Sequence, residues 1–87
     1  MLSGKTKSGF SFEISDESLD NMELIETLAG VDKNPLLLPR LVSQLLGEDQ
    51  KQELYNHLRT DSGVVPVSKV SDEIMEIFQS GKDTKNS

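Results

Sequence analysis

The segment spanning residues 36–46 constrains the fold most, because it gathers large apolar side chains in a chain that has few of them. Only 34% of the 87 residues are hydrophobic. The segment holds seven large apolar residues: Leu36, Leu37, Leu38, Leu41, Val42, Leu45 and Leu46. One short helix cannot turn all seven to one side. The surplus must therefore pack against other elements of the same domain or against a partner.

Two interpretations of this segment stay open at the level of sequence. In the first, it is the core of a small helical domain. In the second, part of it remains exposed as a binding groove or a dimer face, which makes self-association a further expectation. The predicted partner-binding residues are Leu37, Leu38, Leu41, Leu45 and Leu46. Their predicted role is hydrophobic anchoring of a protein partner.

The N-terminal part of the chain has the pattern of a strand. Apolar and polar residues alternate from Phe10 to Ile14, which is typical of a short half-buried β-strand. A turn at residues 7–9 then makes residues 2–6 the other arm of a hairpin. Val64 and Val65 are also expected to be extended, and pairing with this strand is one arrangement open to them.

A first helix is predicted over about residues 16–29. Ser15 is a good N-cap, and the acidic residues after it favour the positive end of the helix dipole. Gly30 is the predicted stop. The expected buried face follows a spacing of three: Leu19, Met22, Ile25 and Leu28.

The remaining chain predicts three more helices. A turn over residues 35–38 leads into a short helix over 39–46, because Pro39 suits only a helix start. Gly47 breaks that helix, and further helices are expected over about 48–60 and 67–79. The predicted fold is mostly α, a small bundle of about four helices with a short N-terminal β-strand or hairpin.

We expect one domain over residues 1–80, followed by a disordered polar tail over residues 81–87. A domain of this size has a thin stability margin. The chain has no cysteine, so disulfides are excluded and a reducing compartment is expected. No segment approaches the roughly 18 apolar residues of a membrane span. The sequence therefore predicts an intracellular protein with no membrane partner.

Charge is distributed unevenly along this acidic chain, whose formal net charge is −6. No Lys or Arg occurs between Lys7 and Lys33. The carboxylates in this gap include Glu13, Asp16, Glu17, Asp20, Glu23 and Glu26. Such a face repels phosphate backbones, so we expect no nucleic-acid partner. It serves either as a solvated helix face or to steer basic partners.

The sequence offers no set of residues for chemistry. His57 is the only histidine, and it stands four residues after Glu53, which on a helix makes a surface pair without a third catalytic member. One histidine with scattered carboxylates does not make a zinc set, and no calcium loop or Gly-rich phosphate loop is present. We expect neither an enzyme nor a cofactor.

The order of these segments resembles a known family. The segments are KTKSGFSFEI (residues 5–14), DNMEL (20–24), PLLLPR (35–40), LLGE (45–48), LYNHLR (54–59), VVPV (64–67) and EIMEIF (73–78). Together they resemble the small tail assembly chaperones of long-tailed phages and prophages of Gram-positive bacteria. The similarity spans nearly the whole chain and rests on overall pattern, because there is no catalytic signature to compare.

The resemblance implies a non-catalytic protein that binds and solubilises the tape-measure protein and helps recruit tail-tube subunits. Such a protein acts in the host cytoplasm and is absent from the mature virion. Two other functions remain open: a structural tail or head-tail component that stays in the virion, and a small regulator of a host protein.

Overall fold

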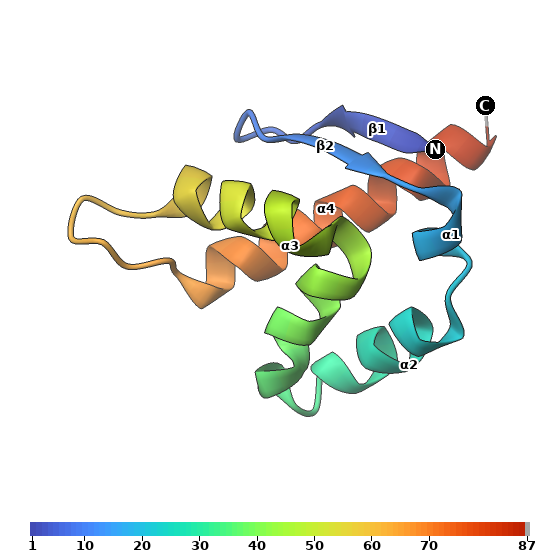
Figure 1. Ribbon diagram of the computed structural model, residues 1–87, viewed down its shortest axis with the longest axis horizontal. Helices are drawn as coiled ribbons and strands as arrows, with labels where there is room; N and C mark the ends of the chain where they lie inside the picture. Colours follow the sequence, from blue (N-terminus) through green and yellow to red (C-terminus); the bar gives the residue numbers. More distant parts are fainter. Residues whose placement is uncertain (87) are drawn as a thin grey trace.

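The computed structural model describes residues 1–86, with side chains for residues 1–80. Within that part, a two-stranded antiparallel hairpin precedes four α-helices and one 3₁₀ helix, and 65% of the chain is helical (Figure 1). This confirms the predicted fold class. None of the described helices is both long and apolar enough to span a bilayer. The predicted disordered tail, residues 81–87, lies outside the residues that the structure describes in full.

The hairpin consists of β1 (Leu2–Lys5) and β2 (Ser11–Ile14), paired from Leu2 opposite Ile14 to Lys5 opposite Ser11. Its turn needs Gly9, whose φ of 98° lies in the left-handed region. Phe12 and Ile14 are buried while Ser11 and Glu13 are exposed, so the predicted alternation is confirmed. The hairpin thus presents one apolar face to the helices.

The predicted single helix over residues 16–29 is wrong, because the chain makes two helices there. These are α1 (Asp16–Leu19) and α2 (Met22–Val31). Ser15 caps α1 as predicted, since its Oγ accepts from the Ser18 N–H. Asn21 then adopts an extended conformation and its Oδ1 accepts from the Glu23 N–H at 3.0 Å. This second N-cap satisfies a free donor and restarts the helix in a new direction.

The predicted buried face is wrong at Leu19, Met22 and Ile25, which are exposed. It is confirmed at Leu28, which packs half-buried against the core. On α2 the fully buried residues are Leu24 and Thr27. Burial of Thr27 is tolerated because its hydroxyl donates to the Glu23 carbonyl at 2.9 Å. The predicted stop at Gly30 is wrong as well, since α2 continues to Val31. A Cβ at residue 30 would lie 3.0 Å from Leu37 Cδ1, so glycine allows a close approach there.

The leucine-rich segment forms the 3₁₀ helix η1 (Pro35–Leu37) and the first half of α3 (Leu38–Leu58). Pro39 lies in the first turn of α3, where a missing N–H costs nothing. Gly47 interrupts α3 with φ 82° and ψ 166°, a conformation essentially restricted to glycine. The predicted break at Gly47 is confirmed, and it divides α3 into two halves that point in different directions (Figure 1).

A loop over residues 59–66 leads to the last helix, α4 (Val67–Asn86). Within the loop, the Thr60 N–H donates to the Val64 carbonyl at 2.8 Å, and the Gly63 N–H donates to the Thr60 carbonyl. These bonds make a local turn. The described chain has only the β1–β2 sheet, so the open alternative in which Val64 and Val65 pair with the N-terminal strand is wrong.

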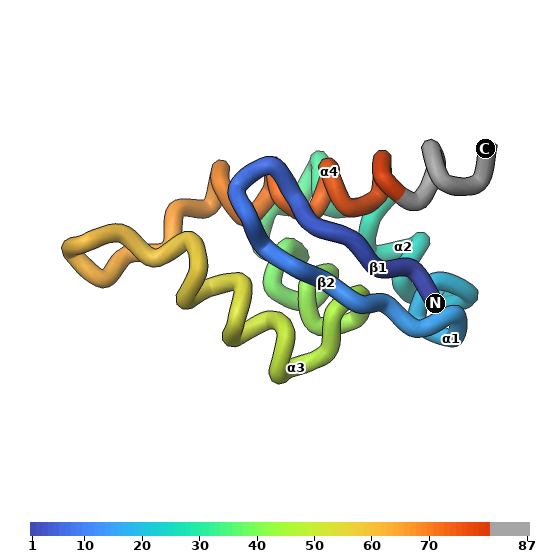
Figure 2. Tube along the Cα trace, turned by 90° about the horizontal axis from the view of Figure 1, so that it is seen from above, coloured from blue at the N-terminus to red at the C-terminus, as the bar shows by residue number. Residues whose placement is uncertain are grey.

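One apolar core joins the hairpin to α2, α3 and α4, with the hairpin lying across α3 and α4 (Figures 1 and 2). Polar contacts fix the hairpin turn on α4: the Thr6 hydroxyl donates to Glu73 Oε1 and the Lys7 N–H donates to Glu76 Oε2, both at 2.7 Å. The core residues are Phe10, Phe12, Ile14, Leu24, Leu38, Leu41, Val42, Leu45, Leu46, Leu54, Val70, Ile74 and Ile77.

Candidate protein-binding surfaces

Four of the five predicted partner-binding leucines lie in the core. Leu41 and Leu45 are each 1% exposed, and Leu38 and Leu46 are also buried. Leu37 is half-buried, with its Cδ1 near Gly30. Most of the surplus of apolar residues packs internally, because α2, α4 and β2 all contact α3. These four side chains are therefore core residues, and their role in partner binding stays a prediction.

Next to these buried leucines, an open apolar groove lies between η1, the two halves of α3 and the start of α4. We call it the η1–α4 groove. Its volume is about 290 Å³. Leu36, which sequence reasoning did not select for binding, stands on its rim and is 85% exposed. The lining residues are Pro35, Leu36, Leu38, Pro39, Tyr55, Val65, Val67 and Val70.

The residue types in this groove suit it to apolar side chains. Pro35 and Pro39 form wall segments that carry no backbone N–H, and the aliphatic side chains add no polar atom. Leu36 and Val67 are exposed although both are large apolar residues. Concave, mostly apolar sites of this size are where proteins accept hydrophobic groups of a ligand or a partner helix.

A small polar network supports the Tyr55 wall of the groove. Lys51 Nζ lies 6.0 Å from the centre of the Tyr55 ring and donates to Ser43 Oγ at 2.9 Å. It also lies 3.4 Å from Glu48 Oε1. A hydrogen bond from Ser43, followed by the charge of Lys51, lowers the pKa of Glu48 below its ordinary value. These contacts join the two halves of α3 across Gly47.

A second surface is formed by residues 15–32, which include α1 and α2 and which we call the acidic arm. Met22 and Ile25 are exposed on α2. At the break between the two helices, Glu17, Ser18, Asp20, Asn21 and Met22 line a hollow of about 370 Å³. Their helical spacing predicts Met22 and Ile25 in the core, and this prediction is wrong because Asn21 caps a new helix there.

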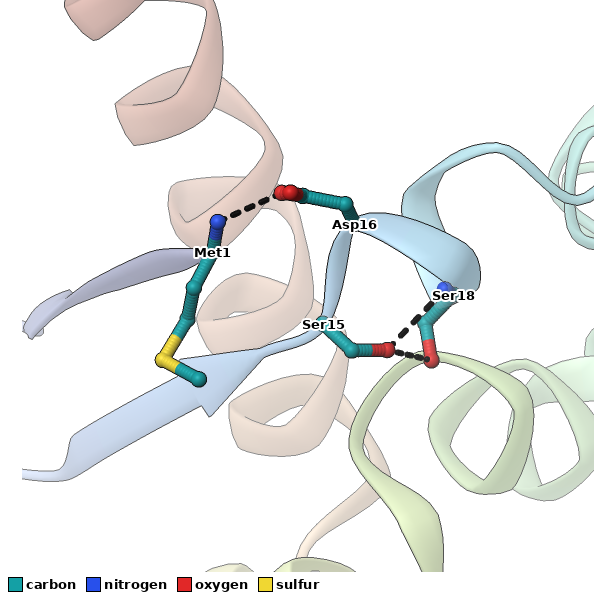
Figure 3. Close-up of polar contacts among 4 residues, drawn as sticks. All are labelled: Met1, Ser15, Asp16 and Ser18. Atoms are coloured by element: carbon teal, nitrogen blue, oxygen red, sulfur yellow. Dashed lines mark hydrogen bonds and ion pairs between the residues drawn. The ribbon is translucent and has the colours of Figure 1, made fainter.

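Figure 3 shows how α1 begins on the acidic arm. The Ser15 hydroxyl accepts from the Ser18 N–H at 3.1 Å and donates to Ser18 Oγ at 3.0 Å. The carboxylate of Asp16 contacts the amino group of Met1 at the start of β1. The first turn of the arm is thereby held against the hairpin.

His57 serves as a contact between α3 and the hairpin. Its Nε2 lies 3.1 Å from Ser8 Oγ and 3.0 Å from the Ser8 carbonyl oxygen, and its ring centre is 5.9 Å from that of Phe10. Glu53, its predicted neighbour, is exposed on the same helix. Among the residues with described side chains, no group of three or more His, Asp or Glu residues is placed to hold a metal ion.

The η1–α4 groove and the acidic arm are therefore two candidate protein-binding surfaces. Both expose apolar side chains, and they lie on different elements of the molecule. Comparisons of the chain with protein-family models, with curated proteins and with solved structures give no match.

Proposed function

We propose that this chain is a non-catalytic phage tail assembly chaperone, which binds and solubilises the tape-measure protein and helps recruit tail-tube subunits. The order of segments along the chain, which resembles that family, supports the proposal. The structural observation that carries it is the η1–α4 groove, an open apolar site on an acidic molecule. In this proposal the chain acts in the host cytoplasm and leaves before the virion is complete.

The physical basis is a transfer of apolar surface from water to the groove. A long helical partner exposes an apolar stripe that promotes aggregation until it is covered. Burying one large aliphatic side chain contributes about 1.5–3 kcal/mol, so a groove that accepts one or two gives reversible binding. The net charge of −6 then keeps the covered partner in solution. Weak binding also suits a protein that must be displaced as the tail tube assembles.

Co-expression with the tape-measure protein of the same phage genome tests the proposal. The wild-type chain should move that protein from the pellet to the soluble fraction. The double variant Leu36→Gln, Val67→Gln should lose this effect, because it makes the groove rim polar. Both residues are exposed, so the helical signal in circular dichroism should persist.

The matched control is Val64→Gln, which changes an exposed valine that does not line the groove. It should solubilise the tape-measure protein as well as the wild type does. Equal activity of the groove variant and the control would contradict the role of the groove. Recovery of the chain from purified virions by mass spectrometry would instead indicate a structural component.

A further inference from the structure

The acidic arm exposes an apolar stripe that the proposed function leaves unused. Met22, Ile25 and Ala29 are spaced by three and four residues, so they share one side of α2. Met22 is 69% exposed, Ile25 is 47% exposed, and Ala29 is exposed as well. The opposite side of α2 is buried through Leu24 and Thr27. The helix is therefore apolar on both sides, and only one side has a partner within the described part of the chain.

The acidic arm carries a formal charge equal to the net charge of the whole chain. Residues 15–32 contain six carboxylates and no Lys or Arg, so their formal charge is −6, the same as that of the complete chain. The carboxylates are Asp16, Glu17, Asp20, Glu23, Glu26 and Asp32. All six are exposed. The negative potential over the outer stripe therefore favours a cationic partner and repels an acidic one.

The hollow at the α1–α2 break has the chemistry of a receptor for one basic side chain. Glu17 and Asp20, which carry carboxylates, line it together with Met22. Lys and Arg carry an aliphatic stem that packs on apolar surface and a charged head that pairs with carboxylates. A volume of about 370 Å³ accommodates such a side chain.

We propose that the acidic arm binds a basic amphipathic helix of a partner protein. Apolar residues of that helix pack on Met22 and Ile25, and one of its Lys or Arg side chains enters the hollow between Glu17 and Asp20. This mode is the docking of an amphipathic helix on a matching apolar stripe, with the flanking charges setting specificity. The inference is independent of the η1–α4 groove, because the two surfaces share no lining residue.

Three synthetic peptides of about 15 residues, long enough for four helical turns, test the proposal. The first places Leu on one helical face and Lys on the other. The second replaces every Lys by Glu, and the third keeps Lys but replaces every Leu by Ser. With the Leu36→Gln, Val67→Gln variant, in which the groove rim is polar, fluorescence anisotropy should show binding of the Leu/Lys peptide alone, and its affinity should fall as salt screens the charges.

Variants of the full chain locate the binding. The pair Glu17→Gln, Asp20→Asn should weaken binding of the Leu/Lys peptide about fivefold, as expected for two exposed ion pairs. Ile25→Gln should weaken it by a similar factor, since half of that side chain is free to be covered. Val64→Gln, which changes an exposed valine on neither surface, is the matched control and should leave the affinity unchanged.

Several outcomes would overturn the proposal. Absence of binding by the Leu/Lys peptide would do so, as would equal binding of the Leu/Glu peptide. Equal binding of the Ser/Lys peptide would mean that charge acts alone. Loss of binding in Leu36→Gln would place the site in the groove. If the free chain dimerises in light scattering and Met22→Gln makes it monomeric, a second copy occupies the stripe instead.

Discussion

The η1–α4 groove and the acidic arm both expose apolar side chains, but they are built differently. The groove is lined by residues from separate parts of the chain between Pro35 and Val70, and none of these lining residues is charged. The arm is one continuous segment, and its exposed stripe stands among six carboxylates. The groove therefore exists only when the tertiary fold is intact, whereas the arm depends mainly on the helical order of α1 and α2.

This difference predicts two kinds of recognition. Binding in an uncharged groove follows apolar area and shape, so it should change little with salt. Binding to the arm combines apolar contact with charge attraction, so salt should weaken it. A partner that needs both surfaces would show intermediate behaviour.

The largest effect should come from the leucines beneath the groove. Leu41→Ala or Leu45→Ala removes a side chain that is almost wholly buried, so each should lower the free energy of unfolding by about 2–5 kcal/mol. Leu36→Ala makes the same chemical change on the exposed rim and should alter stability by less than about 0.5 kcal/mol. Urea denaturation of the three variants measures the contrast. Similar losses at residues 36 and 41 would refute the assignment of core and rim.

The next effect concerns Gly47, which sets the direction of the second half of α3 and hence the position of Tyr55 in the groove. Gly47→Ala should cost about 1–3 kcal/mol, because φ 82° with ψ 166° strains any L-residue. No neighbouring atom lies within 4 Å of a Cβ built there, so the cost is conformational and not a clash. Hydrogen exchange should report disturbance around Tyr55 and little change in α2.

A synthetic chain with D-alanine at position 47 separates these causes. A D-residue adopts a positive φ without backbone strain, so this variant should keep the stability of the wild type. An equal loss for L-alanine and D-alanine would mean that Gly47 matters for a reason other than its backbone conformation.

A smaller effect distinguishes the two asparagine caps. Asn21→Ala removes the N-cap of α2 and should cost about 1 kcal/mol, with faster amide exchange confined to the arm. Asn34→Ala removes the cap of η1, where Oδ1 accepts from the Leu36 N–H at 3.3 Å. Its effect should be smaller and confined to the groove side, because η1 is a single turn. Identical exchange patterns in the two variants would argue against two independent surfaces.

Local chemistry explains which features the sequence predicts. The alternation from Phe10 to Ile14, the Ser15 cap and the break at Gly47 each follow from the residue types themselves, and the structure has all three. Each depends on a few neighbouring residues. The hairpin and the general helical class follow from the same local signals.

The distribution of apolar residues between core and surface could not be predicted in the same way. Leu36 and Leu41 are the same residue type five positions apart, yet only Leu41 is enclosed by other elements. Met22 and Ile25 have helical spacing with Leu19, but the cap at Asn21 starts a new helix and turns them outward. Asn21 followed by an acidic first turn is the sequence signal of the new helix, and the longer apolar periodicity masks it.

The smallest effect should come from Glu48, which begins the second half of α3. Hydrogen bonding from Ser43 and the charge of Lys51 lower its pKa in the folded chain, so folding favours the ionised carboxylate. Its contribution to stability is present above the ordinary pKa range of a glutamate and is lost as the pH falls through the lowered value. Glu48→Gln should therefore reduce the change in melting temperature between neutral and acidic pH. The reduction should be slight, because the side chain is exposed.

Glu53→Gln, which removes an exposed carboxylate from the same half of α3, controls for the loss of charge alone. A matching change in both variants would show that the contacts of Glu48 with Ser43 and Lys51, which join the two halves of α3 beside the groove, do not stabilise the folded chain.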